Sequence, residues 1–228
     1  MIVSIHQPSY WPWLGHLSKI MKSDYHIILD DVDVKRNSYQ YRNIFNNNNK
    51  ITYLTLPIDK TYRKKICDLS FKNNTWPEEH LKLLSIYYKN TNYFDEIYSL
   101  IEPIYKIGKH MKPCEFLTET VNSAMKMLEL KTPLMSSKDL NVDGNKGTKI
   151  LNLVKKVNGK VYLSGEGSKE YLESMNEIFL ENKIKIIYNK HLLPKYDQSN
   201  KLSFIPGLSC LDLLFYQGIQ NARFIFKG

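Results

Sequence analysis

A histidine and two aspartates stand where a general base and an orienting carboxylate could meet. His6 directly follows a short apolar segment at residues 2–5, and Asp30 and Asp31 follow a second one at residues 25–29. If both segments are parallel strands, the three side chains leave one edge of a sheet whose strands lie about 4.8 Å apart. A carboxylate can then orient the imidazole for proton transfer. A histidine that only hydrogen-bonds the turn, beside aspartates that cap a loop, fits the pattern equally well.

A cluster of hydrogen-bond donors follows the aspartates and suits phosphate, sugar hydroxyls or carboxylate. It consists of Lys35, Arg36, Asn37, Tyr39, Gln40, Arg42 and Asn43. A solvated loop explains the same composition on spacing alone. The interleaved basic and aromatic residues also suit nucleic acid, but the sequence lacks helix–turn–helix, zinc-finger and RNA-recognition signatures.

Two further segments have both a binding and a structural explanation. Tyr10, Trp11 and Trp13 follow the first predicted strand closely, so their rings could stack on a sugar or a base, or fill the core around a proline turn. Residues 164–168 read Ser-Gly-Glu-Gly-Ser between a predicted strand and a predicted helix. The two glycines would let an anion approach the backbone, whereas a tight turn capped by Ser168 explains them as well.

Ser209 and Asp212 lie three residues apart before an apolar run, which resembles a capping box with Asp in place of Glu or Gln. We favour helix capping here over a nucleophile–acid pair. Cys210 follows Ser209 inside the apolar stretch and is expected to be buried and unreactive.

The apolar periodicity predicts the elements that must hold these residues. Strands are predicted at residues 2–5, 25–29, 51–58, 160–163 and 184–188. Helices are predicted from residue 14, from residue 76 with Thr75 as N-cap, at 93–105 and 118–130, from Thr148, from Ser168, and at 208–215 with Gly218 closing the last one. Residues 46–49 indicate a surface turn, and residues 136–147 a linker or long loop.

Together these elements predict an α/β protein with a mostly parallel sheet flanked by helices and a helical middle segment. We expect one domain over residues 1–228, with a candidate helical subdomain at about 75–135.

Composition narrows the classes of protein that the chain can represent. The net charge of +9 over 228 residues favours anionic partners. Three cysteines without a C-x-x-C pair rule out a disulfide framework and argue against a thiolate zinc site, and we expect no metal site. We recognise no signal peptide and no membrane-spanning run, so we expect a cytoplasmic protein with reduced thiols.

Residues 5–15, which read Ile-His-Gln-Pro-Ser-Tyr-Trp-Pro-Trp-Leu-Gly, resemble the opening of the WbqC-like family. The resemblance continues nearly end to end through Asp30-Asp31-Val32, residues 37–43, residues 53–57, Trp76 with His80, Tyr93-Phe94, residues 162–165, Tyr171-Leu172 and residues 208–215. The chain departs from the family's pattern at Tyr41, where Asn is expected, and at Lys149, where Arg is common.

Members of this family resemble proteins encoded among bacterial surface-polysaccharide genes, including O-antigen clusters of lipopolysaccharide synthesis. The resemblance therefore implies a transferase that acylates the amine of a nucleotide-linked amino sugar. No motif identifies a bound cofactor, and the expected acyl donor is coenzyme A or an acidic acyl carrier protein. We expect a nucleotide-linked sugar as partner and no nucleic acid. The alternatives are a nucleotidyltransferase-like enzyme that needs a divalent metal, and a non-catalytic protein that binds a nucleotide sugar or acts as a scaffold.

In this hypothesis His6 removes a proton from the amine, and Asp30 or Asp31 orients His6. The expected substrate-binding residues are Gln7, Tyr10, Trp13, Lys35, Asn37, Gln40, Arg42, Asn43, Ser164 and Gly165.

Overall fold

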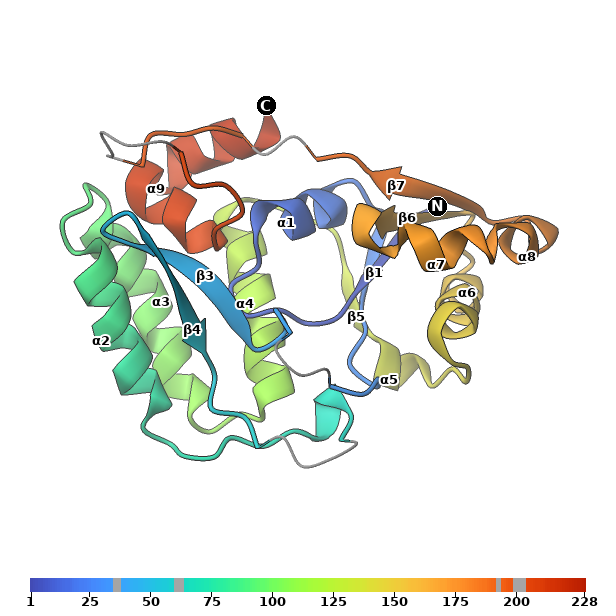
Figure 1. Ribbon diagram of the computed structural model, residues 1–228, viewed down its shortest axis with the longest axis horizontal. Helices are drawn as coiled ribbons and strands as arrows, with labels where there is room; N and C mark the ends of the chain where they lie inside the picture. The colour runs from blue at the N-terminus through green and yellow to red at the C-terminus, as the bar shows by residue number, and fades with distance from the viewer. Residues whose placement is uncertain (35–37, 60–63, 192–193, 199–203) are drawn as a thin grey trace. The chain divides into compact units, whose positions relative to one another are not determined.

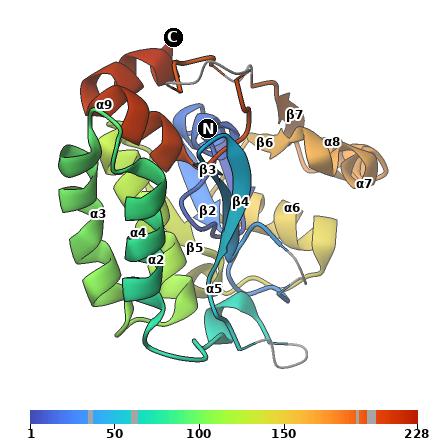
Figure 2. The same ribbon diagram turned by 60° about the vertical axis from the view of Figure 1, so that its left-hand side comes forward.

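The computed structural model describes residues 1–34, 38–59, 64–191, 194–198 and 204–228, and in it the chain forms two compact units (Figures 1 and 2). The first, here called the sheet unit, comprises Met1–Gln7, Gly15–Asp31 and Leu130–Leu192. The second, here called the helical unit, comprises Pro8–Leu14, Val32–Glu129 and Leu193–Gly228. The candidate helical subdomain at about 75–135 falls in the helical unit as far as Glu129.

Parallel strands in the order β5-β2-β1-β6-β7 form the sheet of the sheet unit. In chain order within this sheet, the arrangement reads 3-2-1-4-5, as in doubly wound folds, and the order reverses between β1 and β6. Ligands of such sheets bind outside the carboxyl ends of the strands at the reversal. The α/β class and parallel sheet predicted from the sequence are confirmed. The strands are β1 (Ile2–His6), β2 (Tyr25–Ile28), β5 (Leu134–Ser136), β6 (Val161–Gly165) and β7 (Lys185–Asn189).

Side chains alternate along β1 and β2 between an apolar and a polar face. Val3, Ile5 and Ile27 pack into an apolar cluster with α6 and α8, which includes Val154 and Phe179. Each fully buried side chain of this size contributes about 1.5–3 kcal/mol to stability. Ser4, His6 and His26 occupy intervening positions and therefore point to the opposite face of the sheet, which they share with Ile2 and Ile28. The helices of this unit are α1 (Leu14–Met21), α5 (Ser137–Leu140), α6 (Lys146–Lys156), η2 (Glu166–Ser168), α7 (Lys169–Glu173) and α8 (Asn176–Glu181).

The helical unit combines helices with an antiparallel β-hairpin (Figure 2). Its interior is strongly aromatic: the Trp76 ring lies 4.6 Å from that of Phe116 and 4.7 Å from that of Phe71, measured between centroids. Pro77 occupies the first turn of α2, as the sequence predicted. The elements are β3 (Arg42–Asn47), β4 (Lys50–Thr55), η1 (Ile66–Asp68), α2 (Trp76–Tyr88), α3 (Phe94–Gly108), α4 (Pro113–Met127) and α9 (Cys210–Lys227).

The asparagine run forms the predicted turn, but it belongs to a hairpin that the periodicity did not reveal. Asn48 and Asn49 join β3 to β4 with φ angles of 48° and 68°, a left-handed conformation that asparagine tolerates better than most residues. The polar β3 was predicted as part of a loop, because three asparagines and an arginine among six residues hide the strand pattern.

Two other boundaries differ from the predictions, and a third agrees. Residues 136–147 are not a linker, because Ser136 ends β5 and α5 follows it directly. Helix α6 begins at Lys146 with Asn145 in the N-cap position, so Thr148 lies inside the helix. Gly218 is non-helical, with φ and ψ of 68° and 171°, so it closes the first helical segment of α9 as predicted, and a second segment follows it.

Candidate functional site

The polar face of β1 and β2 carries Ser4, His6 and His26. Ser4 and His26 are register partners on neighbouring strands, and Ser4 Oγ lies 2.7 Å from His26 Nδ1. Ser23 Oγ donates a hydrogen bond to Ser4 Oγ at 2.6 Å, so polar partners continue away from the sheet. Parallel strands that are covered on both faces are usually apolar on both, which makes this polar layer unusual.

Helix α1 adds His16 and Lys19 to this layer. The rings of His16 and His6 lie 4.1 Å apart between centroids, and His16 Nε2 lies 3.3 Å from His26 Nε2. Lys19 Nζ donates to the carbonyl oxygen of Ile5 at 2.9 Å. We call His6, His16, Lys19 and His26 the histidine cluster.

His6 lies at the carboxyl end of β1, and a neighbouring carbonyl oxygen determines which ring nitrogen carries the proton. Its Nδ1 lies 2.8 Å from the carbonyl oxygen of Gln7, and because a carbonyl oxygen only accepts, Nδ1 must carry the proton. The lone pair is therefore on Nε2, and no described residue donates a hydrogen bond to it. Burial, and secondarily the charge of Lys19, lower the pKa of His6 to about 3, so the ring is neutral at physiological pH. His6 Nε2 can thus accept a hydrogen bond from a ligand, and with so low a pKa it would hold a proton only transiently.

The expected contact between His6 and an aspartate is wrong, because both carboxylates are bound elsewhere. Since β2 lies between β1 and β5, the residues that follow it can turn to either neighbour, and the carboxylates contact the β5–α5 junction. Asp30 Oδ1 accepts from the backbone N–H of Lys138 at 3.0 Å, and Asp30 Oδ2 accepts from Ser136 Oγ at 2.7 Å. Ser137 Oγ lies 3.0 Å from Asp30 Oδ1 and 2.5 Å from Asp31 Oδ1.

Lys149 completes this second group, here called the aspartate cluster (Asp30, Asp31, Ser136, Ser137 and Lys149). Lys149 Nζ forms an ion pair with Asp31 Oδ2 at 2.5 Å and also bonds the carbonyl oxygen of Val142. Burial alone would raise the pKa of Asp31, but the hydrogen bonds from Lys149 and Ser137 outweigh it, so the pKa lies below its usual value. The lysine that departs from the family's pattern in the sequence is therefore the counter-charge of Asp31.

Ser164 and Gly165 end β6, which pairs with β1 at the reversal of the strand order. Ser164 Oγ lies 2.5 Å from Ser168 Oγ, and Ser168 Oγ donates to the carbonyl oxygen of Gly165 at 2.7 Å. Ser168 stands at the N-cap position of α7 but makes no side-chain capping bond there, and its hydroxyl instead closes the turn back onto Gly165. A Cβ added at Gly165 or Gly167 would meet nothing within 4 Å, so open space lies beside both glycines.

Several predicted substrate-binding residues lie inside the helical unit. Tyr10 is fully buried, and its hydroxyl bonds Tyr105 and His80 Nδ1, the latter at 2.8 Å. Asn43 donates to the carbonyl oxygens of Tyr10 and Trp11 at 3.1 and 2.7 Å, and Gln40 is also buried. These polar groups hold the proline turn, whose Trp11 has a φ of 40°. We therefore do not retain Tyr10, Gln40 and Asn43 as ligand contacts.

The remaining predicted residues are placed as follows. Trp13 is exposed, and the Arg42 guanidinium lies 4.6 Å from the centroid of the Tyr53 ring and 5.7 Å from that of Tyr39. Gln7 belongs to the sheet unit, and its carbonyl oxygen fixes the His6 tautomer. Lys35 and Asn37 lie outside the described residues.

The predicted capping pair at the start of α9 separates into two roles. Ser209 is the N-cap, with its Oγ accepting from the backbone N–H of Leu211 at 3.3 Å, as predicted. Asp212 does not cap the helix, because its carboxylate accepts from Tyr88, Tyr196 and Gln198 at 3.0, 2.8 and 3.1 Å. Burial raises the pKa of Asp212 to about 6, against the effect of these donors. Cys210 is buried as expected, and burial raises its pKa to about 12.

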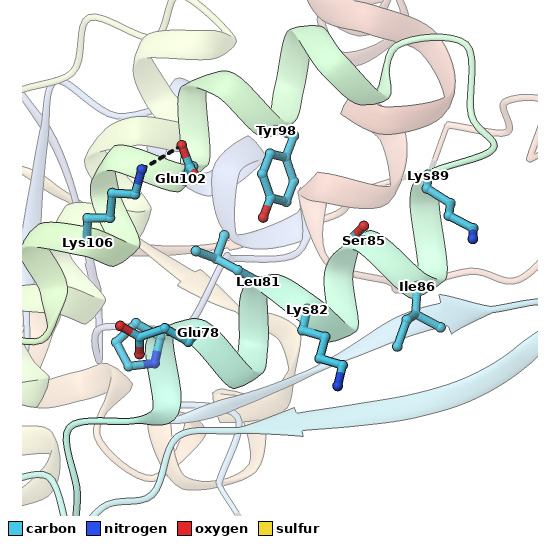
Figure 3. A pocket seen from close by; sticks show the side chains of 10 residues that line it. Glu78, Leu81, Lys82, Ser85, Ile86, Lys89, Tyr98, Glu102 and Lys106 are labelled. Carbon is cyan, nitrogen blue, oxygen red and sulfur yellow. Dashed lines mark ion pairs between the residues drawn. The ribbon is translucent and has the colours of Figure 1, made fainter.

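A pocket of about 460 Å³ lies along α2 and α3 (Figure 3). Its charged side chains have both signs, and Lys106 forms an ion pair with Glu102 at 2.9 Å. Lys82 extends from α2, Lys89 from the residue that follows α2, and Tyr98 from α3. None of the predicted site residues lines it, so we assign no chemistry to this pocket.

Two searches of the described residues gave negative results. In the described ranges, no three His, Cys, Asp or Glu side chains are arranged to hold a metal ion, and this includes the histidine cluster. No helix of the described chain combines the length and apolar character needed to cross a membrane.

Comparison with known proteins places the chain in a family. It is 26% identical over 227 residues to a Mycobacterium tuberculosis protein named "Uncharacterized protein Rv1507c", a match that covers 98% of this chain and 96% of that protein. The family model described as "WbqC-like protein family" matches residues 7–224. Because this match covers nearly the whole chain, the protein belongs to the WbqC-like family.

Proposed function

We propose that the protein is a transferase of bacterial surface-polysaccharide biosynthesis that moves an acyl group to the amine of a nucleotide-linked amino sugar. Family membership supports the polysaccharide context that the sequence resemblance implied. The observation that carries the proposal is a neutral His6, with Nδ1–H donating to Gln7 and a lone pair on Nε2, at the strand-order reversal of a parallel sheet.

In the proposed reaction, the sugar amine attacks the thioester carbonyl of an acyl–coenzyme A or acyl carrier protein. A C–N bond forms and the C–S bond breaks. His6 Nε2 takes the proton that the nitrogen loses and returns it to the leaving thiolate. The carbonyl oxygen of Gln7 stabilises the imidazolium that forms transiently, since it accepts from Nδ1–H in both charge states.

Each unit offers candidate groups for binding the substrate, and each set is proposed by itself. The open space beside Gly165 and Gly167 admits a diphosphate close to the backbone. We also propose contacts from Arg42, and from Lys35 and Asn37 on the basis of their chemistry alone. The net charge of +9 favours both a diphosphate and an acidic carrier protein.

Mass spectrometry of reaction mixtures tests the proposal. Purified protein is incubated with uridine- and thymidine-diphosphate amino sugars and with acyl–coenzyme A or acyl carrier protein donors. Wild type and the control His110→Ala, which alters an exposed histidine, should give the N-acylated sugar, and His6→Ala should not. Calorimetric binding of the nucleotide sugar without product from any donor would replace the transferase with a binding protein.

A further inference from the structure

Lys19 is a buried cation without an acidic partner. Its side chain is only 4% exposed, and its hydrogen bond goes to a neutral acceptor, the carbonyl oxygen of Ile5. Among the described residues no carboxylate forms an ion pair with it. Lysine is almost never fully buried unless it is paired, because the ammonium loses its hydration in the interior. Its position therefore calls for an explanation beyond packing.

Among the residues that the structure describes, the titratable groups around Lys19 are all bases. They are His6 on β1, His16 on α1 and His26 on β2, so each element that contributes to the polar layer brings a histidine and none brings a carboxylate. The charge of Lys19 contributes to the lowered pKa of each histidine. For His6 and His26 it is the largest cause after burial. For His16 it is smaller than burial and the effects of the other two histidines. The acceptor of Lys19 belongs to Ile5, the residue directly before His6, so the ammonium also anchors the backbone that carries the proposed base.

We propose that Lys19 is a positioning residue that holds the end of β1 through its hydrogen bond to Ile5, and that its buried positive charge adds to burial in keeping His6 neutral. The inference rests on the proposed role of His6 as a base, but its test requires no turnover.

Below about pH 7, a positively charged Lys19 favours a neutral His6. Burial lowers the pKa of Lys19 to about 7, so the side chain is charged below that pH. Over the same range, an ordinary histidine would gain a proton near pH 6.5. With Lys19 charged, a second positive charge on His6 is unfavourable, and its Nε2 lone pair remains available. Removing the positive charge should therefore raise the pKa of His6 and move its protonation to higher pH.

Nuclear magnetic resonance of protein labelled at histidine tests this directly. The His6 signals are assigned by their loss in His6→Gln, and their pH titration is followed in folded wild type and variants. Lys19→Met removes both charge and donor, Lys19→Gln keeps a donor without charge, and Lys19→Arg keeps both. We expect the His6 midpoint to rise by about one pH unit or more in Lys19→Met and Lys19→Gln, and to stay close to wild type in Lys19→Arg.

Lys22→Met is the matched control on the same helix. The Lys22 ammonium bonds Asn189 Oδ1 at 3.0 Å and not the histidine cluster, so its loss should leave the His6 midpoint unchanged. An unchanged midpoint in folded Lys19→Met and Lys19→Gln, or an equal shift in Lys22→Met, would overturn the proposal. If both neutral variants fail to fold, a wild-type His6 midpoint at 6 or above overturns the proposal.

If the enzyme is active, the acid limb of kcat/KM should move to higher pH in Lys19→Gln, in step with the His6 midpoint. If no substrate is turned over, the proposed function fails while the titration result still stands. The two hypotheses are therefore tested separately.

Discussion

The aspartate cluster and the histidine cluster lie in the same sheet unit, but they differ in how completely their polar atoms are bonded. All four carboxylate oxygens of Asp30 and Asp31 accept hydrogen bonds, and the charge of Asp31 is balanced by Lys149. His6 Nε2 has no donor among the described residues, and Lys19 has no counter-charge there. A saturated group stabilises the fold, whereas a group with an open lone pair and an unbalanced charge can act on a ligand. The comparison supports a structural role for the aspartates and the proposed chemical role for His6.

Replacing His6 should have the largest effect on activity. We expect His6→Ala to abolish turnover or ligand binding, because the Nε2 lone pair is lost. The melting temperature should change by only a few degrees, as for a surface substitution, since His6 is only partly buried. Calorimetry alongside the product assay checks this. Collapse of the fold in His6→Ala would make His6 a packing residue and remove the difference between the two clusters.

Replacing Lys149 should have the largest effect on stability. Lys149→Met leaves the Asp31 carboxylate buried without its cation, which should cost about 3 kcal/mol in the free energy of unfolding. Lys149→Arg should retain most of the wild-type free energy of unfolding. The pKa of Asp31 is lower in the folded protein than its unfolded value of 3.8. The ionised carboxylate therefore contributes to stability above pH 3.8, and this contribution is lost as the pH falls through the pKa of the folded protein.

Urea titrations of wild type and Lys149→Met at several pH values measure both effects. The two stability curves should converge in acid, where Asp31 is protonated in both proteins. A stable Lys149→Met variant with normal acid dependence but no turnover would mean that the aspartate cluster is part of the reaction after all.

Arg42 extends the comparison to the helical unit. We expect Arg42→Ala to weaken nucleotide-sugar binding by about ten- to a hundredfold, because a charge-assisted bond to phosphate is worth about 1.5–3 kcal/mol. Lys50→Ala, which removes an exposed cation from the same hairpin, is the control. Calorimetric titration at low and high salt measures both, and the loss should be smaller at high salt. Equal affinities for wild type and Arg42→Ala would remove Arg42 from the site.

The Ser209 hydroxyl, like the two aspartates, has hydrogen-bond partners within the protein. Its replacement should have the smallest effect on stability and activity. Its Oγ accepts from Leu211 and donates to the carbonyl oxygen of Trp11 at 3.0 Å. Ser209→Ala should therefore cost about 1 kcal/mol, as expected for a lost N-cap, and activity per folded molecule should persist. Ser99→Ala, on the exposed face of α3, should cost less in the same denaturation experiment. A stable but inactive Ser209→Ala would return Ser209 to the list of catalytic candidates.

The sequence predicted strands best where a short apolar segment is bounded by polar residues. Residues 2–5 and 25–29 predicted parallel strands and, with them, the position of His6 at a sheet edge, which the β1–β2 register bears out. The sheet order could not be predicted, because the long insertion of the helical unit separates β2 from β5. Without that order, the aspartates could turn toward either β1 or β5.

The histidine cluster was missed because polar residues inside buried elements look like exposed ones in a sequence. The signal was the alternation itself: Ser4 and His6 share one face of β1, opposite Val3 and Ile5, and His26 faces away from Ile27. Asp212 was misassigned for a related reason. Its spacing from Ser209 matches a capping box, and nothing in the local sequence indicates donors from Tyr88 and Tyr196.

The most direct test of the central claim is the proton position on His6 in folded wild type. Nitrogen-15 chemical shifts of the labelled ring at pH 6.5 distinguish the two neutral tautomers from the imidazolium. The account predicts a neutral ring with the proton on Nδ1 and a bare Nε2, since Gln7 accepts from Nδ1. A proton on Nε2, or a charged ring at that pH, would contradict it.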